Sequence, residues 1–224
     1  MRKLSSFLSV FLLIFGAVYF LQLNNSEGQQ VEFDLPYSAN AEEASEDAAP
    51  IIEMMRGDGD APVEMIEYAA FTCPFCAKFH AEAYPNLKAN YIDKGLVKFV
   101  YREVYFHKFG VWASLIARCA GKTKFFGIID EIYRKHGEWT SAESDMAVVT
   151  QFKKIGLLAG LEEPELNSCL QDGTKLRALI KWYEDNAKRD GIKSTPTLMI
   201  NGEKHSYTSY EALTELLDEI LEKS

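Results

Sequence analysis

The sequence predicts an α/β domain into which an all-helical subdomain is inserted, and three observations support this fold class. A strand-like apolar run leads into a Cys-x-x-Cys sequence that opens an amphipathic segment, and a second strand-like segment follows. Residues 109–170 then show only helical periodicity. Finally, a Thr-Pro dipeptide precedes an Asn-Gly turn between two short strand-like runs. We expect the α/β domain to occupy residues 61–224 and the helical insertion to occupy about residues 107–172.

The composition is that of a globular protein with moderate negative charge. The chain has 224 residues, of which 47% are hydrophobic and 25% are charged, and its net charge is −9. This length is sufficient for one substantial core. The sequence contains no basic patch and no run of Lys and Arg, so nucleic-acid binding has no support.

The first 25 residues have the layout of an export signal. Arg2 and Lys3 precede an uncharged stretch whose apolar part is just long enough to span a bilayer. We expect residues 4–23 to form an uncleaved anchor in the inner membrane, with the N-terminus inside the cell, and a cleaved signal peptide is the alternative. In either case the rest of the chain is exported. Residues 26–60, which are polar and acidic, are expected to form a flexible linker.

Residues 63–69 form the first predicted strand, and one of them is unusual. Alternation places Val63, Met65 and Glu67 on one face of this strand. A carboxylate on an otherwise apolar face, six residues before the first cysteine of the Cys-x-x-Cys, suggests that Glu67 accepts and returns the proton of the second cysteine. The alternative is a glutamate at the end of a strand that points at water.

The Cys-x-x-Cys consists of Cys73 and Cys76, with Pro74 at the first position of the following helix. This spacing places both sulfur atoms within one helical turn, so the pair can close a short disulfide. Cys73 lies where helical N–H groups have no partners and the helix dipole is positive, which favours a thiolate. The dipole alone contributes about 0.3–1 kcal/mol, so a large pKa shift also requires direct hydrogen bonds from N–H groups. A zinc half-site and an inert structural disulfide are the alternatives to a redox-active pair.

The helix after Cys76 is expected to run to residue 91 and to kink at Pro85, which removes a backbone hydrogen bond. His80 lies four residues after Cys76 and therefore on the same helix face. It is a candidate to tune the thiols electrostatically or to pass a proton, and a half-exposed histidine without such a role is the alternative. Residues 97–104 alternate as a second strand, which completes a right-handed βαβ unit.

The helical stretch contains the other two cysteines, Cys119 and Cys169. In an oxidising compartment, four cysteines favour two disulfides. Because local geometry strongly favours a Cys73–Cys76 bond, the second disulfide would join Cys119 to Cys169. That bond would close a loop of about fifty residues and add roughly 4 kcal/mol to stability. Two buried free thiols are the alternative.

After a predicted long helix, Thr195 and Pro196 stand directly before a predicted strand. A cis peptide bond between them would explain a proline in this place, since the cis form of an X–Pro bond costs only about 0.5–1 kcal/mol. Asn201-Gly202 then predicts a hairpin whose first strand covers residues 197–200. A last amphipathic helix ends the chain.

This order of elements resembles that of the DsbA-type thiol–disulfide oxidoreductases, which have a thioredoxin fold with an all-helical insertion. The chain looks most like the exported bacterial branch that carries a second cysteine pair. The likeness covers about residues 61–221. It depends on two motifs in the same order and separation, Phe71-Thr72-Cys73-Pro74-Phe75-Cys76 and Thr195-Pro196-Thr197.

The resemblance implies a role for each matching residue. Cys73 would be the exposed attacking cysteine and Cys76 the buried resolving cysteine. Pro196 would be a cis-proline that faces the disulfide, and the Thr195 backbone would pair with an extended substrate peptide. Glu67 matches the buried acid of the family. No cofactor and no metal are expected.

Two positions depart from the family pattern. The best-known oxidants carry a histidine at the position of Phe75, which helps to hold the thiolate, and an acid at the position of His80. Phe75 removes a donor and a possible positive charge, so the reduced form should be less stabilised and the protein less oxidising. Each 1.4 kcal/mol of lost stabilisation lowers the reduction potential by about 30 mV.

The sequence therefore predicts an exported, periplasmic thiol–disulfide oxidoreductase. Its substrates would be unfolded or folding exported proteins with thiols, and a membrane redox partner or a small oxidant would reoxidise it. A periplasmic reductase or isomerase fed by a membrane reductant is the first alternative, because Phe75 favours that direction. A tethered binding module or holdase for exported chains, with a vestigial cysteine pair, is an alternative of a different class, and a metal carrier is a third.

Overall fold

The computed structural model describes residues 49–223. The predicted anchor over residues 4–23 and most of the predicted linker lie outside the described residues. Within residues 49–223, no helix combines the length and the apolar character that crossing a membrane requires.

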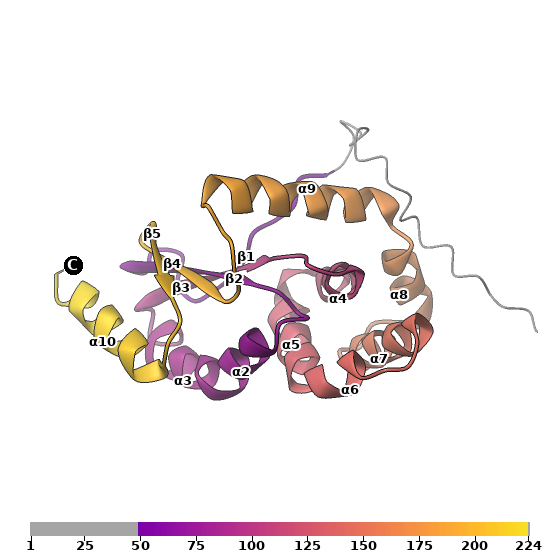
Figure 1. The fold of residues 1–224 in the computed structure, drawn as a ribbon, viewed down its shortest axis with the longest axis horizontal. Helices are drawn as coiled ribbons and strands as arrows, with labels where there is room; N and C mark the ends of the chain where they lie inside the picture. Colours follow the sequence, from indigo (N-terminus) through magenta and orange to yellow (C-terminus); the bar gives the residue numbers. More distant parts are fainter. Residues whose placement is uncertain (1–48, 224) are drawn as a thin grey trace, which may run out of the picture. The chain divides into compact units, whose positions relative to one another are not determined.

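A five-stranded mixed sheet forms the centre of the described unit (Figure 1). Its strands lie in the order β1-β3-β2-β4-β5. β2 and β3 are parallel, as the predicted βαβ unit requires, and the other neighbouring strands are antiparallel. The strands are β1 (Met54–Arg56), β2 (Val63–Ala69), β3 (Val97–Glu103), β4 (Thr197–Ile200) and β5 (Glu203–Ser206).

Strand β1 corrects the predicted end of the linker. The sequence predicts a flexible segment up to residue 60, but Met54 pairs with Tyr101 at the edge of the sheet and is only 4% exposed. The turn after β1 depends on Gly57, which has a φ of +99° and whose added Cβ would lie 2.6 Å from the Val97 carbonyl oxygen. The folded domain therefore begins earlier than predicted, because a single buried methionine and the free edge of β3 hold a short strand in place.

The helix that begins at Pro74 breaks sooner than the sequence predicts. In place of one kinked helix, the structure has α2 (Pro74–Glu82), α3 (Tyr84–Leu87) and a π-helical turn, η1 (Lys88–Ile92). The break falls at Ala83, just before Pro85, which has no N–H to donate to the preceding turn. Proline therefore ends one helix and allows a second to start in a new direction.

Five helices occupy the stretch where the sequence predicts a helical insertion: α4 (Lys108–Cys119), α5 (Gly121–Arg134), α6 (His136–Thr140), α7 (Asp145–Leu158) and α8 (Glu163–Leu170). They pack closely on one another. A Cβ added at Gly156 in α7 would lie 2.4 Å from Leu166 Cδ2 in α8, so any larger residue there would force the buried Leu166 side chain to move.

Two further helices complete the covering of the sheet (Figure 1). Helix α9 (Gly173–Arg189) lies over one face, where Tyr183 packs against Tyr68 and neighbouring apolar side chains. Helices α2, α3 and α10 (Tyr210–Leu221) lie on the opposite side, and the Tyr84 ring of α3 packs 5.0 Å from that of Phe99 in β3. The carboxyl end of β2 is therefore enclosed between elements from distant parts of the sequence.

Candidate active site

The Cys-x-x-Cys lies where the sequence predicts, at the junction of β2 and α2. Cys73 is the N-cap of α2, with extended backbone angles, and Pro74 follows as the first helical residue. The Cys73 N–H donates to the Ala70 carbonyl at 3.0 Å, which closes the turn after β2. The first turn of α2 therefore points its unpaired N–H groups at the Cys73 sulfur.

Both cysteines of this pair are thiols in the structure, which thus represents the dithiol form. Cys73 is partly exposed, and its pKa is lowered from 9.0 to about 5. The Cys76 thiol, which donates to the Cys73 sulfur, is the main cause, and the Thr195 side chain and the backbone N–H groups of Cys76 and Phe75 add to it. A depression of this size exceeds what the helix dipole alone supplies, so direct hydrogen bonds are needed, as the sequence argument anticipates.

Cys76 differs from Cys73 in its burial and in the direction of its pKa shift. Its side chain is completely buried. Burial raises the pKa of the Cys76 thiol strongly, and its hydrogen bond to Cys73 and the charge of Glu67 raise it further. The lowered pKa therefore favours a partly exposed thiolate at Cys73 at neutral pH, and Cys76 is a buried proton donor.

The Thr195–Pro196 peptide bond is cis, and it lies at the cysteine pair. The Thr195 carbonyl oxygen is 3.4 Å from Cys73 Sγ. A carbonyl oxygen can only accept, so this contact suits the protonated sulfur, whereas the Thr195 side chain favours the thiolate. The two motifs that are 122 residues apart in the sequence thus meet at one sulfur atom.

Glu67 and His80 form a buried pair beneath the thiols. Glu67 Oε2 lies 2.9 Å from His80 Nε2, and both side chains are almost completely inaccessible to solvent. The alternatives of a glutamate pointing at water and of a half-exposed histidine are both wrong, since Glu67 is 0% and His80 7% exposed. Glu67 faces inward from β2 on the side covered by α2, which is why alternation could find it.

Sequence reasoning missed the aromatic rings around this pair. The His80 ring stacks on Tyr133 at 4.2 Å and contacts Tyr84 at 4.8 Å and Tyr101 at 6.0 Å. These rings come from α5, α3 and β3, so no spacing in the sequence links them to His80. Phe75, between the two cysteines, packs on none of them and is 70% exposed.

A protein-family model described as thioredoxin matches residues 51–219 of the chain. The chain belongs to the thioredoxin family. A Rickettsia bellii protein named protein-disulfide oxidoreductase is 30% identical over 173 residues, which cover 77% of this chain and 66% of the relative's own length. Disulfide bond formation protein D of Bacillus subtilis is 26% identical over 74% of this chain and 75% of its own. The chain thus spans slightly less than two thirds of the Rickettsia relative.

Solved structures confirm the fold of this thioredoxin-family chain. The alpha-DsbA1 structure from Wolbachia pipientis has a TM-score of 0.71, with 24% identity, and the match covers 76% of this chain and 92% of that one. The predicted thioredoxin-like fold of the DsbA type, with a helical insertion, is therefore confirmed.

The second cysteine pair of this thioredoxin-family chain is also where the sequence predicts. Cys119 and Cys169 form a disulfide with a sequence separation of 50. Next to it, Arg118 makes a buried two-point ion pair with Glu103, at 2.6 and 2.7 Å, and donates to the Ile52 carbonyl at 2.8 Å. The sequence analysis missed this ion pair, because its partners lie on a helix and a strand whose contact no local pattern indicates.

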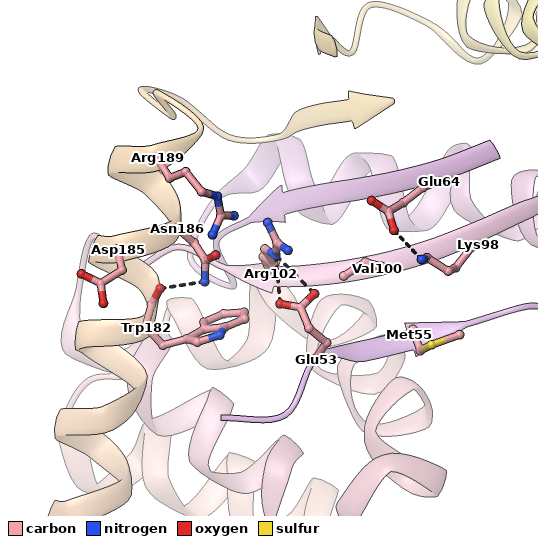
Figure 2. A pocket seen from close by; sticks show the side chains of 10 residues that line it. All are labelled: Glu53, Met55, Glu64, Lys98, Val100, Arg102, Trp182, Asp185, Asn186 and Arg189. Atoms are coloured by element: carbon pink, nitrogen blue, oxygen red, sulfur yellow. Dashed lines mark hydrogen bonds and ion pairs between the residues drawn. The ribbon is translucent and has the colours of Figure 1, made fainter. Parts of the chain in front are cut away.

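One cleft of the described unit lies away from the cysteine pair. It has a volume of about 510 Å³ and lies between α9 and the outer part of the sheet (Figure 2). Its three cations are each paired with a carboxylate: Lys98 with Glu64, Arg102 with Glu53 and Asp190, and Arg189 with Asp190. No group of three or more potential metal ligands occurs among residues 49–223. The two sequence motifs meet at the cysteine pair and not at this cleft.

Proposed function

We propose that the chain is a thiol–disulfide oxidoreductase that introduces or exchanges disulfides in exported proteins through Cys73 and Cys76. The observation that carries this proposal is the asymmetry of the two sulfurs. The pKa of Cys73 is lowered to about 5, whereas burial raises that of Cys76. A stable, exposed thiolate beside a buried thiol is what disulfide exchange requires of an attacking and a resolving cysteine.

The reaction begins with the Cys73–Cys76 disulfide. A substrate thiolate attacks Cys73 Sγ, a new S–S bond joins substrate and Cys73, and Cys76 leaves as a thiolate that takes up a proton. A second substrate thiolate then attacks the substrate sulfur of this mixed disulfide, and Cys73 leaves as a stable thiolate. The substrate has lost two electrons, and the protein holds them as the dithiol.

Thr195 and Pro196 would bind the substrate backbone. The Thr195 carbonyl oxygen lies 3.4 Å from Cys73 Sγ, so an extended peptide that pairs with the Thr195 backbone would bring its own cysteine to Cys73 Sγ. Pro74 fixes the start of α2, and the exposed Phe75 ring would meet apolar substrate side chains.

Glu67 would serve as the proton acceptor of Cys76. Its charge acts directly on the Cys76 thiol, and its buried Oε1 has no protein hydrogen-bond partner among the described residues. A free carboxylate oxygen next to a buried thiol can take the proton when Cys76 must become a nucleophile.

The direction of exchange in the cell follows from the stability of the dithiol form. Phe75 provides no charge to hold the Cys73 thiolate, which favours a reductase or isomerase. The strong depression of the Cys73 pKa stabilises the dithiol form and therefore favours an oxidant. We propose the oxidant direction, because the hydrogen bonds from Cys76 and Thr195 take over the task that a histidine at position 75 would perform.

The site of action would be the bacterial periplasm. Residues 4–23 would anchor the chain in the inner membrane, near a membrane redox partner that reoxidises the dithiol. The Cys119–Cys169 disulfide is consistent with an oxidising compartment.

A trapping experiment tests the proposal. The Cys76→Ala variant, expressed in the periplasm, should accumulate mixed disulfides between Cys73 and exported proteins, because the resolving thiol is missing. The Cys73→Ala/Cys76→Ala double variant is the matched control and should accumulate none. A Cys76→Ala variant without mixed disulfides would contradict the proposal, and a double variant that keeps the biological role would favour a binding module.

The redox state of the cysteine pair in cells distinguishes the two directions. Alkylation of acid-quenched cells should find Cys73 and Cys76 mostly oxidised if the protein is an oxidant. A mostly reduced pair would establish the reductase or isomerase alternative.

A further inference from the structure

The Glu67–His80 pair has two hydrogen-bonding atoms without a protein partner in a buried part of the described unit. Glu67 Oε2 is bonded to His80 Nε2 at 2.9 Å, but Glu67 Oε1 and His80 Nδ1 are both buried without a protein partner among the described residues. A buried polar atom without a hydrogen bond costs free energy. Two such atoms in neighbouring side chains therefore call for an explanation.

Three tyrosines surround the Glu67–His80 pair. Tyr84, Tyr101 and Tyr133 enclose the His80 ring, and the Tyr101 and Tyr133 hydroxyls lie 2.7 Å apart. Burial raises the pKa of all three tyrosines, so they stay neutral at physiological pH.

Charged groups on this side include Arg56 from β1 and Asp130 from α5, and Lys88 of η1 and Glu131 of α5 also act on Asp130. Arg56 donates to the Tyr84 hydroxyl at 2.9 Å and lies 3.8 Å from Asp130. Burial raises the pKa of Asp130, and the charges of Arg56 and His80 lower it. The Asp130 carboxylate is 44% exposed, so this group belongs to the surface, whereas the side chains of the Glu67–His80 pair are at most 2% exposed.

We infer that Glu67 and His80 act as one proton acceptor for Cys76, with His80 sharing the proton that Glu67 takes. The inference rests on the proposed function and deepens it. In reoxidation, Cys73 is held in a mixed disulfide and Cys76 must lose its proton before its sulfur can attack. The proton goes to the pair, which gains one positive charge. The electron pair of Cys76 forms the new S–S bond to Cys73, and the leaving group departs as a thiolate.

His80 makes this transfer favourable in two ways. Glu67 Oε2 is hydrogen-bonded to His80 Nε2. When Glu67 Oε1 takes a proton, this hydrogen bond lets the imidazole share the added charge with the carboxylate. The Tyr133 ring also presents its face to the imidazole, at 4.2 Å, and the face of an aromatic ring attracts positive charge. His80 is therefore a positioning residue for the proton, one step removed from the reacting sulfur.

The test separates the two steps of glutathione-driven oxidation. The reduced protein is mixed with oxidised glutathione, and acid-quenched samples are analysed by mass spectrometry for the Cys73–glutathione mixed disulfide and for the Cys73–Cys76 disulfide. His80→Gln keeps a donor toward Glu67 but cannot carry the proton. It should slow resolution of the mixed disulfide by about 10²-fold, the lower end of what general acid–base catalysis contributes.

Three further results are expected if the pair acts as a unit. Glu67→Gln should slow resolution by a similar factor, and the Glu67→Gln/His80→Gln double variant should be no slower than either. Both single variants should lose the pH dependence that the wild type shows in this step. Formation of the mixed disulfide should change by less than about twofold, since it needs only the Cys73 thiolate.

His136→Gln is the matched control. His136 also has a buried ring nitrogen without a protein partner and packs on an aromatic ring, that of Trp139 at 5.3 Å, but it belongs to α6. Its substitution should leave both steps unchanged. Wild-type rates and pH dependence in His80→Gln would overturn the inference and leave the proposed function intact. Failure of the wild type to form any mixed disulfide would instead refute the proposed function.

A measurement on the unaltered protein covers the case in which His80→Gln does not fold. With 15N-labelled histidine, the ring nitrogen signals of His80 should shift between the dithiol and disulfide forms, whereas those of His136 should not. Signals of His80 that are identical in both forms would overturn the inference.

Discussion

The two cysteine pairs of this chain lie at opposite ends of helices. Cys73 caps the N-terminus of α2, whereas Cys119 is the last residue of α4 and Cys169 the second-last residue of α8. The first pair is in the thiol form in the structure, and the second is a disulfide. Cysteine is thus present both as a thiol pair and as a disulfide in this structure.

The helix ends explain much of this difference. Unpaired N–H groups and a positive dipole stabilise a thiolate at Cys73, so this sulfur is both a good nucleophile and a good leaving group. At Cys119 and Cys169 the nearby backbone groups are carbonyls with a negative dipole, which disfavour a thiolate and therefore disfavour opening of the disulfide. On the proposed function, position on a helix therefore contributes to the difference between the exchanging pair and the structural pair, and the hydrogen bond from Cys76 is the larger cause of the Cys73 pKa depression.

The largest expected effect comes from removing the second pair. The Cys119→Ala/Cys169→Ala variant should lose about 4 kcal/mol of unfolding free energy, because the bond closes a loop with a separation of 50 residues in the unfolded chain. Disulfide exchange by Cys73 and Cys76 should change by less than about twofold at temperatures where the variant is folded. Urea unfolding and glutathione oxidation measure the two quantities.

Cys73→Ala provides the opposite case. It should abolish exchange and leave the Cys119–Cys169 bond in place. The assignment of a structural role to Cys119 and Cys169 would be wrong if the Cys119→Ala/Cys169→Ala variant were as stable as the wild type. It would also be wrong if that variant lost disulfide exchange while still folded.

A smaller effect follows from the pH dependence of the dithiol form. A thiol whose pKa is depressed in the folded state adds stability that is fully present above its unfolded value, near 9.0, and lost as the pH falls through about 5. The full depression corresponds to roughly 5 kcal/mol, and solvent screening at a partly exposed sulfur reduces this to about 2 kcal/mol.

The measurement is the unfolding free energy of the protein with Cys73 and Cys76 selectively reduced, from pH 9 to pH 4, against the Cys73→Ala variant. The difference should shrink between pH 9 and pH 5 and then stay constant. The Cys119–Cys169 disulfide does not titrate and should add no such slope. A difference that does not vary with pH would show that the Cys73 thiolate is not stabilised by the fold.

The features that sequence alone could predict are those with a local cause. Asn201-Gly202 requires positive φ at both residues and therefore marked the hairpin, and both have it in the structure. The proline before β4 similarly predicted the cis bond that faces Cys73. The alternation of β2 placed Glu67 on the inward face.

The features that escaped prediction depend on contacts between distant elements. The burial of His80 is decided by rings from α3, α5 and β3, so its position on α2 left a half-exposed side chain equally plausible. β1 is only three residues long and exists because β3 offers it an edge. Such features follow from tertiary packing, which overrides local propensity.

The smallest expected effect concerns residue 75, the position that separates this chain from the best-known oxidants. Phe75 is 70% exposed, so Phe75→His removes little packing and adds a possible positive charge beside the Cys73 thiolate. The thiolate should gain about 1.4 kcal/mol, which lowers the pKa of Cys73 below its value of about 5 and raises the reduction potential by about 30 mV. Equilibration with glutathione measures the potential.

Phe75→Leu is the control for shape and should leave the potential unchanged. Because an exposed charge is screened, the gain from Phe75→His should decrease between low and high salt, whereas the stabilisation by the buried Cys76 thiol should not. An unchanged potential in Phe75→His would mean that Cys76 and Thr195 already hold the thiolate as firmly as this site allows. The difference between the two cysteine pairs would then depend on the buried hydrogen bonds alone.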